Sequence, residues 1–165
     1  MNLDTNKKVL FLTNMENGMD RILQEVSDIR SENILTIQSY GPLILNSYGD
    51  IMRSIIIAIY QENVKEIFVV GTEDKRITSV NLVSQLDAMK DKILKNDDSF
   101  QNSMNKFLDG NVDEWLAGKE NVSENIEKCV DIISNHSLVP PDVKVRGLIV
   151  NNKNGNFSIV EVPSN

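Results

Sequence analysis

One short apolar segment, residues 67–70, constrains the fold of this chain more than any other feature. It reads Ile-Phe-Val-Val, follows a charged pair and ends at Gly71. Runs of this length that are rich in β-branched and aromatic residues, without polar alternation, are typical of strands buried on both faces. Such strands occur mainly in parallel sheets. The segment therefore predicts a strand over residues 66–70 within a parallel sheet.

Similar apolar runs recur along the chain and alternate with helical patterns. Together they predict central strands at residues 9–12, 34–37, 66–70 and 145–150. A last pair of runs, 145–150 and 157–162, is separated by a turn containing Asn154-Gly155, which favours a hairpin-like pair. Strand–helix–strand alternation indicates an α/β fold with a parallel β-sheet core flanked by helices and joined by right-handed crossovers.

Four helical segments are predicted between these strands. Apolar residues at helical spacing indicate helices over about residues 19–30 and 82–93, and a clear amphipathic helix from Val122 to Ile133. Residues 51–60 are apolar almost all round, which favours a buried helix or a dimer surface. We expect Ser47 to cap this helix, Asp50 to lie in its first turn and Asn63 to end it.

Length, charge and composition narrow the class of protein. A chain of 165 residues fits a single domain, residues 1–165. Its net charge of −7 argues against nucleic acid or an anionic membrane surface as the main partner. No apolar run approaches the roughly 18 residues that a membrane-spanning helix needs, and the N-terminus lacks a signal-peptide pattern. We therefore expect a cytoplasmic protein without membrane insertion.

Three segments in a fixed order carry a resemblance to a known family. Residues 47–76 contain Asp50-Ile51-Met52-Arg53-Ser54 and then the strand that ends at Gly71. Residues 114–140 contain the long amphipathic helix and its exit loop, and residues 142–155 contain Arg146-Gly147. In this order and spacing, residues 8–162 resemble the β-class carbonic anhydrases. The resemblance implies a four-stranded parallel core and a homodimer formed through about residues 34–60.

The resemblance also locates the positions at which that family binds zinc. The family uses a Cys-x-Asp-x-Arg motif after the first strand and a His-x-x-Cys motif after the third. Here Asn14, Glu16 and Gly18 occupy the first motif, and Thr72 and Lys75 occupy the ligand positions of the second. An amide, a hydroxyl and an ammonium do not replace two thiolates and an imidazole as zinc ligands. The sequence therefore predicts no metal and no cofactor.

We call these substituted positions the vestigial pocket; it consists of Asn14, Glu16, Gly18, Thr72, Asp74 and Lys75. In one interpretation, Lys75 replaces the charge of the metal, pairs with Glu16 or Asp74, and leaves a site for a small anion such as bicarbonate. In the other, the pocket has collapsed and Lys75 extends to solvent. Glu16, Glu73 and Asp74 could also be carboxylate ligands of Mg²⁺. The neighbouring positive charges of Lys75 and Arg76 disfavour such a site.

Cys129 and His136 are the only cysteine and the only histidine. Cys129 lies on the apolar face of its predicted helix, which favours a small core residue over a nucleophile. His136 follows the end of that helix, where a positive charge is favourable, and we expect it to act in that way. General-base catalysis by this histidine would need a positioned partner.

Three function hypotheses follow. The first is a pseudo-enzyme: a zinc-free binding or scaffold protein with a protein partner or a small anion ligand, linked to inorganic-carbon handling by analogy alone. The second is a metal-independent enzyme that uses Glu16 or Lys75 as acid or base. The third is an active carbonate dehydratase with a rebuilt zinc site, which needs ligands that this chain lacks.

Overall fold

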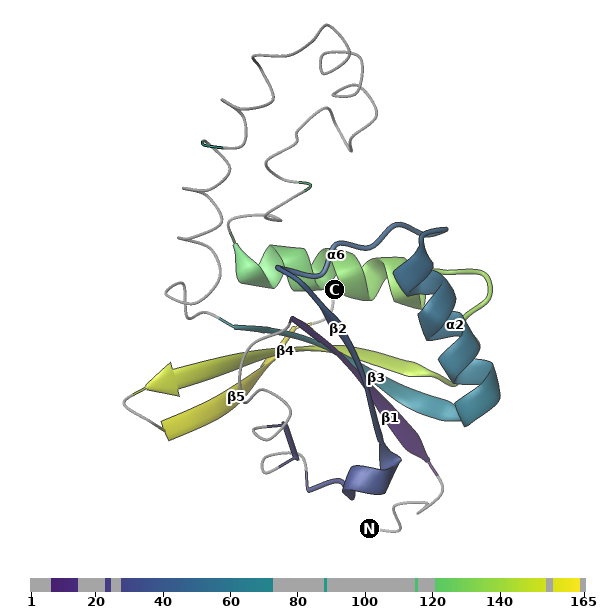
Figure 1. Ribbon diagram of the computed structural model, residues 1–165, viewed down its shortest axis with the longest axis horizontal. Helices are drawn as coiled ribbons and strands as arrows, with labels where there is room; N and C mark the ends of the chain where they lie inside the picture. Colours follow the sequence, from purple (N-terminus) through teal and green to yellow (C-terminus); the bar gives the residue numbers. More distant parts are fainter. Residues whose placement is uncertain are drawn as a thin grey trace, which may run out of the picture.

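The computed structural model describes residues 7–14, 23–24, 28–72, 88, 115, 121–153 and 156–163. Five strands form one sheet in the order β2-β1-β3-β4-β5 (Figure 1). They are β1 (Lys8–Asn14), β2 (Ile34–Ser39), β3 (Val64–Thr72), β4 (Lys144–Lys153) and β5 (Asn156–Val162). The first four are parallel, and β5 runs antiparallel to β4. The predicted α/β class and the terminal hairpin are confirmed.

Three strands, β1, β3 and β4, lie inside the sheet and pair with a neighbour on each side. In β1 every residue after Lys8 is buried, and β3 pairs with β1 on one side and β4 on the other. Residues 34–37 were expected among the central strands, but β2 forms an edge. Its exposed positions, Thr36 and Gln38, alternate with half-buried ones, as is usual for a strand at a sheet edge.

Two helices cover one face of the sheet (Figure 1). They are α2 (Asp50–Glu62) and α6 (Val122–Ser134), and the only other helical element with described bounds is the 3₁₀ turn η1 (Ser31–Asn33). The core on this face joins Leu10 and Leu12 of β1 to buried residues of both helices. On the opposite face, Phe11 and Phe68 stack with ring centroids 5.3 Å apart.

Helix α2 begins with a different N-cap residue from the one expected, but it ends where expected. Gly49, not Ser47, is the N-cap residue, and no side chain caps the helix. Asp50 does lie in the first turn, and Asn63 ends the helix in the left-handed conformation with φ 55°. Only Met52, Ile55 and Ile59 are buried, so the helix is covered on one side alone although residues 51–60 are apolar almost all round.

The first predicted helix also ends earlier than expected. Leu23 and Gln24 are helical, but Asp28 has a left-handed φ of 57° and Arg30 is extended, so no helix reaches residue 30. The predicted helix at residues 82–93 lies outside the described residues apart from Ala88. No helix in the described part of the chain is long and apolar enough to cross a membrane.

Helix α6 matches its prediction and packs very closely on the sheet. The Asn121 side chain caps it by accepting hydrogen bonds from the backbone N–H groups of Ser123 and Glu124. A Cβ at Gly71 would lie 2.8 Å from side-chain carbons of both Val122 and Ile126. The two glycines of the sheet, Gly71 and Gly147, therefore admit the helix where a side chain would obstruct it.

Candidate functional site

Two residues of the vestigial pocket lie at the same edge of the sheet. Asn14 is the last residue of β1 and Thr72 is the last of β3, which is its parallel neighbour. The pairing of these strands ends at Leu12 and Val69, so Asn14 and Thr72 follow it by two and three residues. The carboxyl ends of parallel strands are where α/β sheets place their sites.

These two residues differ in exposure. Asn14 is 8% exposed, whereas Thr72 is half-buried. Both make polar interactions within the molecule. Glu16, Gly18, Asp74 and Lys75 lie outside the described residues, so the expected pairing of Lys75 with a carboxylate stays a prediction.

The single cysteine is a core residue, as its place on the apolar helix face predicted. Cys129 is 2% exposed, and its thiol donates a hydrogen bond to the carbonyl oxygen of Leu43 at 3.3 Å. Burial raises the pKa of the thiol from 9.0 to about 11, and a backbone hydrogen bond with Leu45 and the charge of Lys128 oppose this only in part. At neutral pH the sulfur is a thiol, which is neither a good nucleophile nor a zinc ligand.

The single histidine is buried, which differs from the expectation of a helix-terminal charge. His136 Nδ1 accepts a hydrogen bond from the backbone N–H of Leu138 at 3.1 Å. Its Nε2 lies 2.9 Å from the carbonyl oxygen of Ser47, to which it donates. Because Nδ1 must accept, the bonded ring is the neutral tautomer that carries its proton on Nε2. The reason for the difference is tertiary: the ring connects two loops rather than facing solvent.

The loop around His136 fastens both ends of α2, a feature that sequence patterns did not indicate. Tyr60 Oη donates to the carbonyl oxygen of Leu138 at 2.8 Å, and the ring of Tyr48 meets the imidazole edge-on with centroids 5.7 Å apart. We call His136, Leu138, Ser47, Tyr48 and Tyr60 the histidine latch. Its bonds occupy both ring nitrogens, so the histidine is not placed for general-base catalysis.

His136 does not lie near the end of β3. The first turns of α6, at Val122 and Ile126, lie over Gly71, and His136 is fourteen residues beyond Val122. At 1.5 Å per residue, this places the histidine about 20 Å away along the helix direction. The residues that do end β1 and β3 offer an amide and a hydroxyl, which do not fit zinc.

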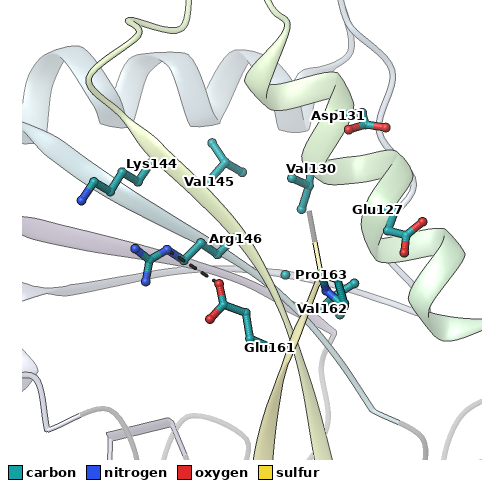
Figure 2. A pocket seen from close by; sticks show the side chains of 10 residues that line it. Glu127, Val130, Asp131, Lys144, Val145, Arg146, Glu161, Val162 and Pro163 are labelled. Atoms are coloured by element: carbon teal, nitrogen blue, oxygen red, sulfur yellow. Dashed lines mark ion pairs between the residues drawn. The ribbon is translucent and has the colours of Figure 1, made fainter. Parts of the chain in front are cut away.

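A cavity of about 280 Å³ lies elsewhere, between α6 and the β4–β5 end of the sheet (Figure 2). Its lining includes Glu127 and Asp131 of α6, Arg146 of β4, and Glu161 of β5. No pattern in the sequence indicated this cavity. The one local signal is Pro163, which follows the last strand and cannot continue its hydrogen-bond ladder.

Comparisons with known proteins address the family. No protein-family model matches the chain. The carbonic anhydrase-like protein YbcF of Bacillus subtilis is 60% identical over 163 residues, which cover 99% of this chain and 92% of YbcF. Its name assigns a likeness to carbonic anhydrase rather than an activity.

Solved structures share the fold at low identity. The β-carbonic anhydrase isoform I of Trichomonas vaginalis aligns with a TM-score of 0.70 and 19% identity, covering 93% of this chain and 82% of that one. The apo form of a carbon disulfide hydrolase aligns with a TM-score of 0.63 and 20% identity, covering 93% and 78%. The identity to YbcF together with this shared fold shows that the chain belongs to the β-carbonic anhydrase family.

Proposed function

We propose that this chain is a zinc-free member of its family, which does not hydrate CO2 and acts as a binding or scaffold protein. The observation that supports this most is the chemistry of Asn14 and Thr72 at the ends of β1 and β3. The family resemblance assigns zinc-ligand positions to both residues, and neither side chain suits zinc. Without zinc, no bound water is activated near neutral pH to attack CO2.

The remaining cysteine and histidine argue against a rebuilt zinc site. Cys129 is buried in the core as a thiol, and both ring nitrogens of His136 are engaged in hydrogen bonds. Each would have to abandon its present partners to bind a metal. A cysteine- and histidine-based zinc centre at the ends of β1 and β3 therefore requires residues that this chain places elsewhere.

In the proposed binding role, the vestigial pocket holds a small anion such as bicarbonate. Lys75 supplies the positive charge there, and Asn14 and Thr72 supply polar groups. An association with inorganic-carbon handling rests on fold analogy. Titration with bicarbonate, against chloride at equal ionic strength, should shift the amide resonances of Asn14 and Thr72; equal shifts with both salts would contradict anion recognition.

Metal analysis and CO2 hydration test the central claim. Protein produced in zinc-supplemented medium should contain far less than one zinc per chain and hydrate CO2 no faster than buffer. One zinc per chain, with hydration that chelators abolish, would refute the proposal.

A gain-of-function variant provides the matched control. Asn14→Cys, Thr72→His and Lys75→Cys together restore the ligand types at the inferred positions, and this triple variant should bind about one zinc per chain, as a site with three protein ligands does. A folded triple variant that binds none would show that these positions are wrongly assigned.

A further inference from the structure

The edge of β4 is left open where β5 stops. Strand β4 begins at Lys144, but its pairing with β5 extends only as far as Gly147 and Val162. Residues 144–146 therefore pair with β3 alone among the described strands. Pro163 follows Val162 and has no N–H to donate. The backbone groups of this short segment that point away from β3 pair with no described strand, and they form an open edge of the kind that accepts an added strand.

The 280 Å³ cavity opens along this edge, and we call it the strand-edge cavity (Figure 2). Helix α6 forms one wall with Glu127, Val130 and Asp131. The other lining residues come from the start of β4, including Val145, and from the end of β5 at Val162 and Pro163. The cavity therefore combines an open backbone edge with an aliphatic lining, which is what a short extended peptide requires.

The charges around the cavity are unevenly compensated. Arg146 lies 3.6 Å from Glu66 and 3.9 Å from Glu161, so the guanidinium at the β4–β5 side is matched by two carboxylates. On α6, Glu127 and Asp131 are one helical turn apart and form no ion pair with any described residue. Among the described residues this wall therefore carries two carboxylates without an ion pair, while the cation Lys144 lines the cavity from β4.

We propose that the strand-edge cavity binds an extended segment of a partner protein in which an aliphatic residue and a lysine or arginine lie two positions apart, so that both side chains project from the strand towards α6. The segment adds to the open edge of β4 along the line of β5. Its aliphatic side chain contacts Val130 and Val145, and its cation faces Glu127 and Asp131. This inference rests on the proposed binding role and identifies a partner chemistry for it.

Peptide titrations followed by amide NMR test this inference. The probe is acetyl-Val-Thr-Lys-amide, in which Val and Lys project to the same face of a strand, compared with acetyl-Val-Thr-Glu-amide and with a lysine peptide whose backbone nitrogens are methylated. The lysine peptide should shift the amides of residues 144–147 and of α6 near Glu127 and Asp131. The glutamate and methylated peptides should bind much more weakly, because one repels the carboxylates and the other lacks strand donors.

Two variants distinguish recognition of the peptide by the cavity carboxylates from a general effect of the negative charge of α6. Glu127→Gln with Asp131→Asn should weaken binding of the lysine peptide about five- to tenfold, since two exposed charge pairs are lost. Glu124→Gln changes an exposed carboxylate on the same helix that does not line the cavity, and it should leave the affinity unchanged. Equal effects of both changes, or equal binding of all three peptides, would overturn the proposal.

Other occupants give distinct results. Shifts at residues 144–147 that depend on protein concentration without peptide would assign the cavity to a second copy of this chain and overturn the inference. Shifts at the same residues on deletion of Ser164 and Asn165 would assign it to the chain's own end, with the same consequence. Peptide-induced shifts at Asn14 and Thr72 instead would keep the binding role but refute this location. Zinc content and CO2 hydration are measured independently of all these outcomes.

Discussion

His136 is fixed by two backbone groups of opposite polarity. It accepts from the N–H of Leu138 and donates to the carbonyl of Ser47, at 3.1 and 2.9 Å. No other neutral side chain supplies an acceptor and a donor on opposite edges of one rigid ring. The residue therefore serves the connection between α2 and the loop after α6 rather than catalysis.

Replacing this histidine should loosen the latch. We expect His136→Ala to lower the free energy of unfolding by about 1–3 kcal/mol, because two backbone groups lose their partners. It should also speed hydrogen exchange at the Leu138 amide. Urea denaturation and exchange NMR measure both effects. Ser137→Ala, at an exposed neighbouring position, is the control, and equal stability of the two variants would contradict this role.

Ionisation of the Cys129 thiol makes the free energy of unfolding depend on pH in the alkaline range. The folded pKa of its thiol is about 11, against 9.0 for an ordinary thiol. A raised folded pKa means that the folded state retains the proton longer than the unfolded state. This contribution to stability is therefore complete below pH 9 and is lost as the pH rises towards 11, with a slope of at most about 1.4 kcal/mol per pH unit.

The measurement is unfolding free energy at pH 8 to 11 for the natural chain and for Cys129→Ala. The natural chain should lose more stability over this interval than the variant, which has no thiol to ionise. In addition, the native thiol should react with a disulfide reagent at pH 8 only as fast as the protein unfolds. Rapid labelling of the native protein would show that the thiol is accessible and the argument wrong.

Among the helices and strands, the position of α6 depends on two glycines of the sheet beneath it, which have no side chains to hold the helix away. Its residues Val122 and Ile126 lie directly over Gly71, and Ile126 also lies over Gly147. An isoleucine in a helix has one strongly preferred χ1 rotamer, so it cannot easily move aside for an added methyl group. The close contact of α6 with β3 and β4 therefore depends on both glycines.

A methyl group at Gly147 should displace the helix. A Cβ there would overlap Ile126 Cγ2, so we expect Gly147→Ala to lower the free energy of unfolding by about 1–3 kcal/mol. Ile126→Ala combined with Gly147→Ala should cost less than the sum of the two single changes, because the shortened side chain makes room. Additive effects in denaturant titrations would show that the overlap is not the cause.

For the whole molecule, exposed tyrosines gather in the region expected to form a homodimer. Tyr40 is 89% exposed and Tyr48 is 90% exposed, and both lie within residues 34–60. Strand β2 is an edge strand and pairs with β1 alone in the described sheet. Tyr40 directly follows this strand, and a large exposed aromatic side chain next to an unpaired strand edge is typical of a surface that another chain covers.

We therefore expect a homodimer of twice the 18.6 kDa chain mass at tens of micromolar. Tyr40→Glu combined with Tyr48→Glu should shift the protein to monomer, because two carboxylates would be desolvated in the interface. Sedimentation velocity measures this. Phe157→Glu on β5, at the opposite edge of the sheet, is the control and should remain dimeric. A monomeric natural chain would rule the dimer out.

The sequence by itself determined the types of the main elements. Residues 66–70 and Val122–Ile133 were correctly assigned because strand and helix periodicity is a local property of the chain. That Asn14 and Thr72 occupy zinc-ligand positions is an expectation from the family resemblance, and it needs only the residue identities.

Only the tertiary structure decided which strand lies at an edge of the sheet. It also decided which groups form hydrogen bonds with His136 and where the strand-edge cavity opens. Each depends on contacts between residues far apart in the chain, such as His136 with Ser47 or Gly147 with Val162. Local periodicity carries no information on these pairings. The position of β2, the neutral histidine and the open edge at residues 144–146 follow from the register of the sheet and the packing of α6 and α2 upon it.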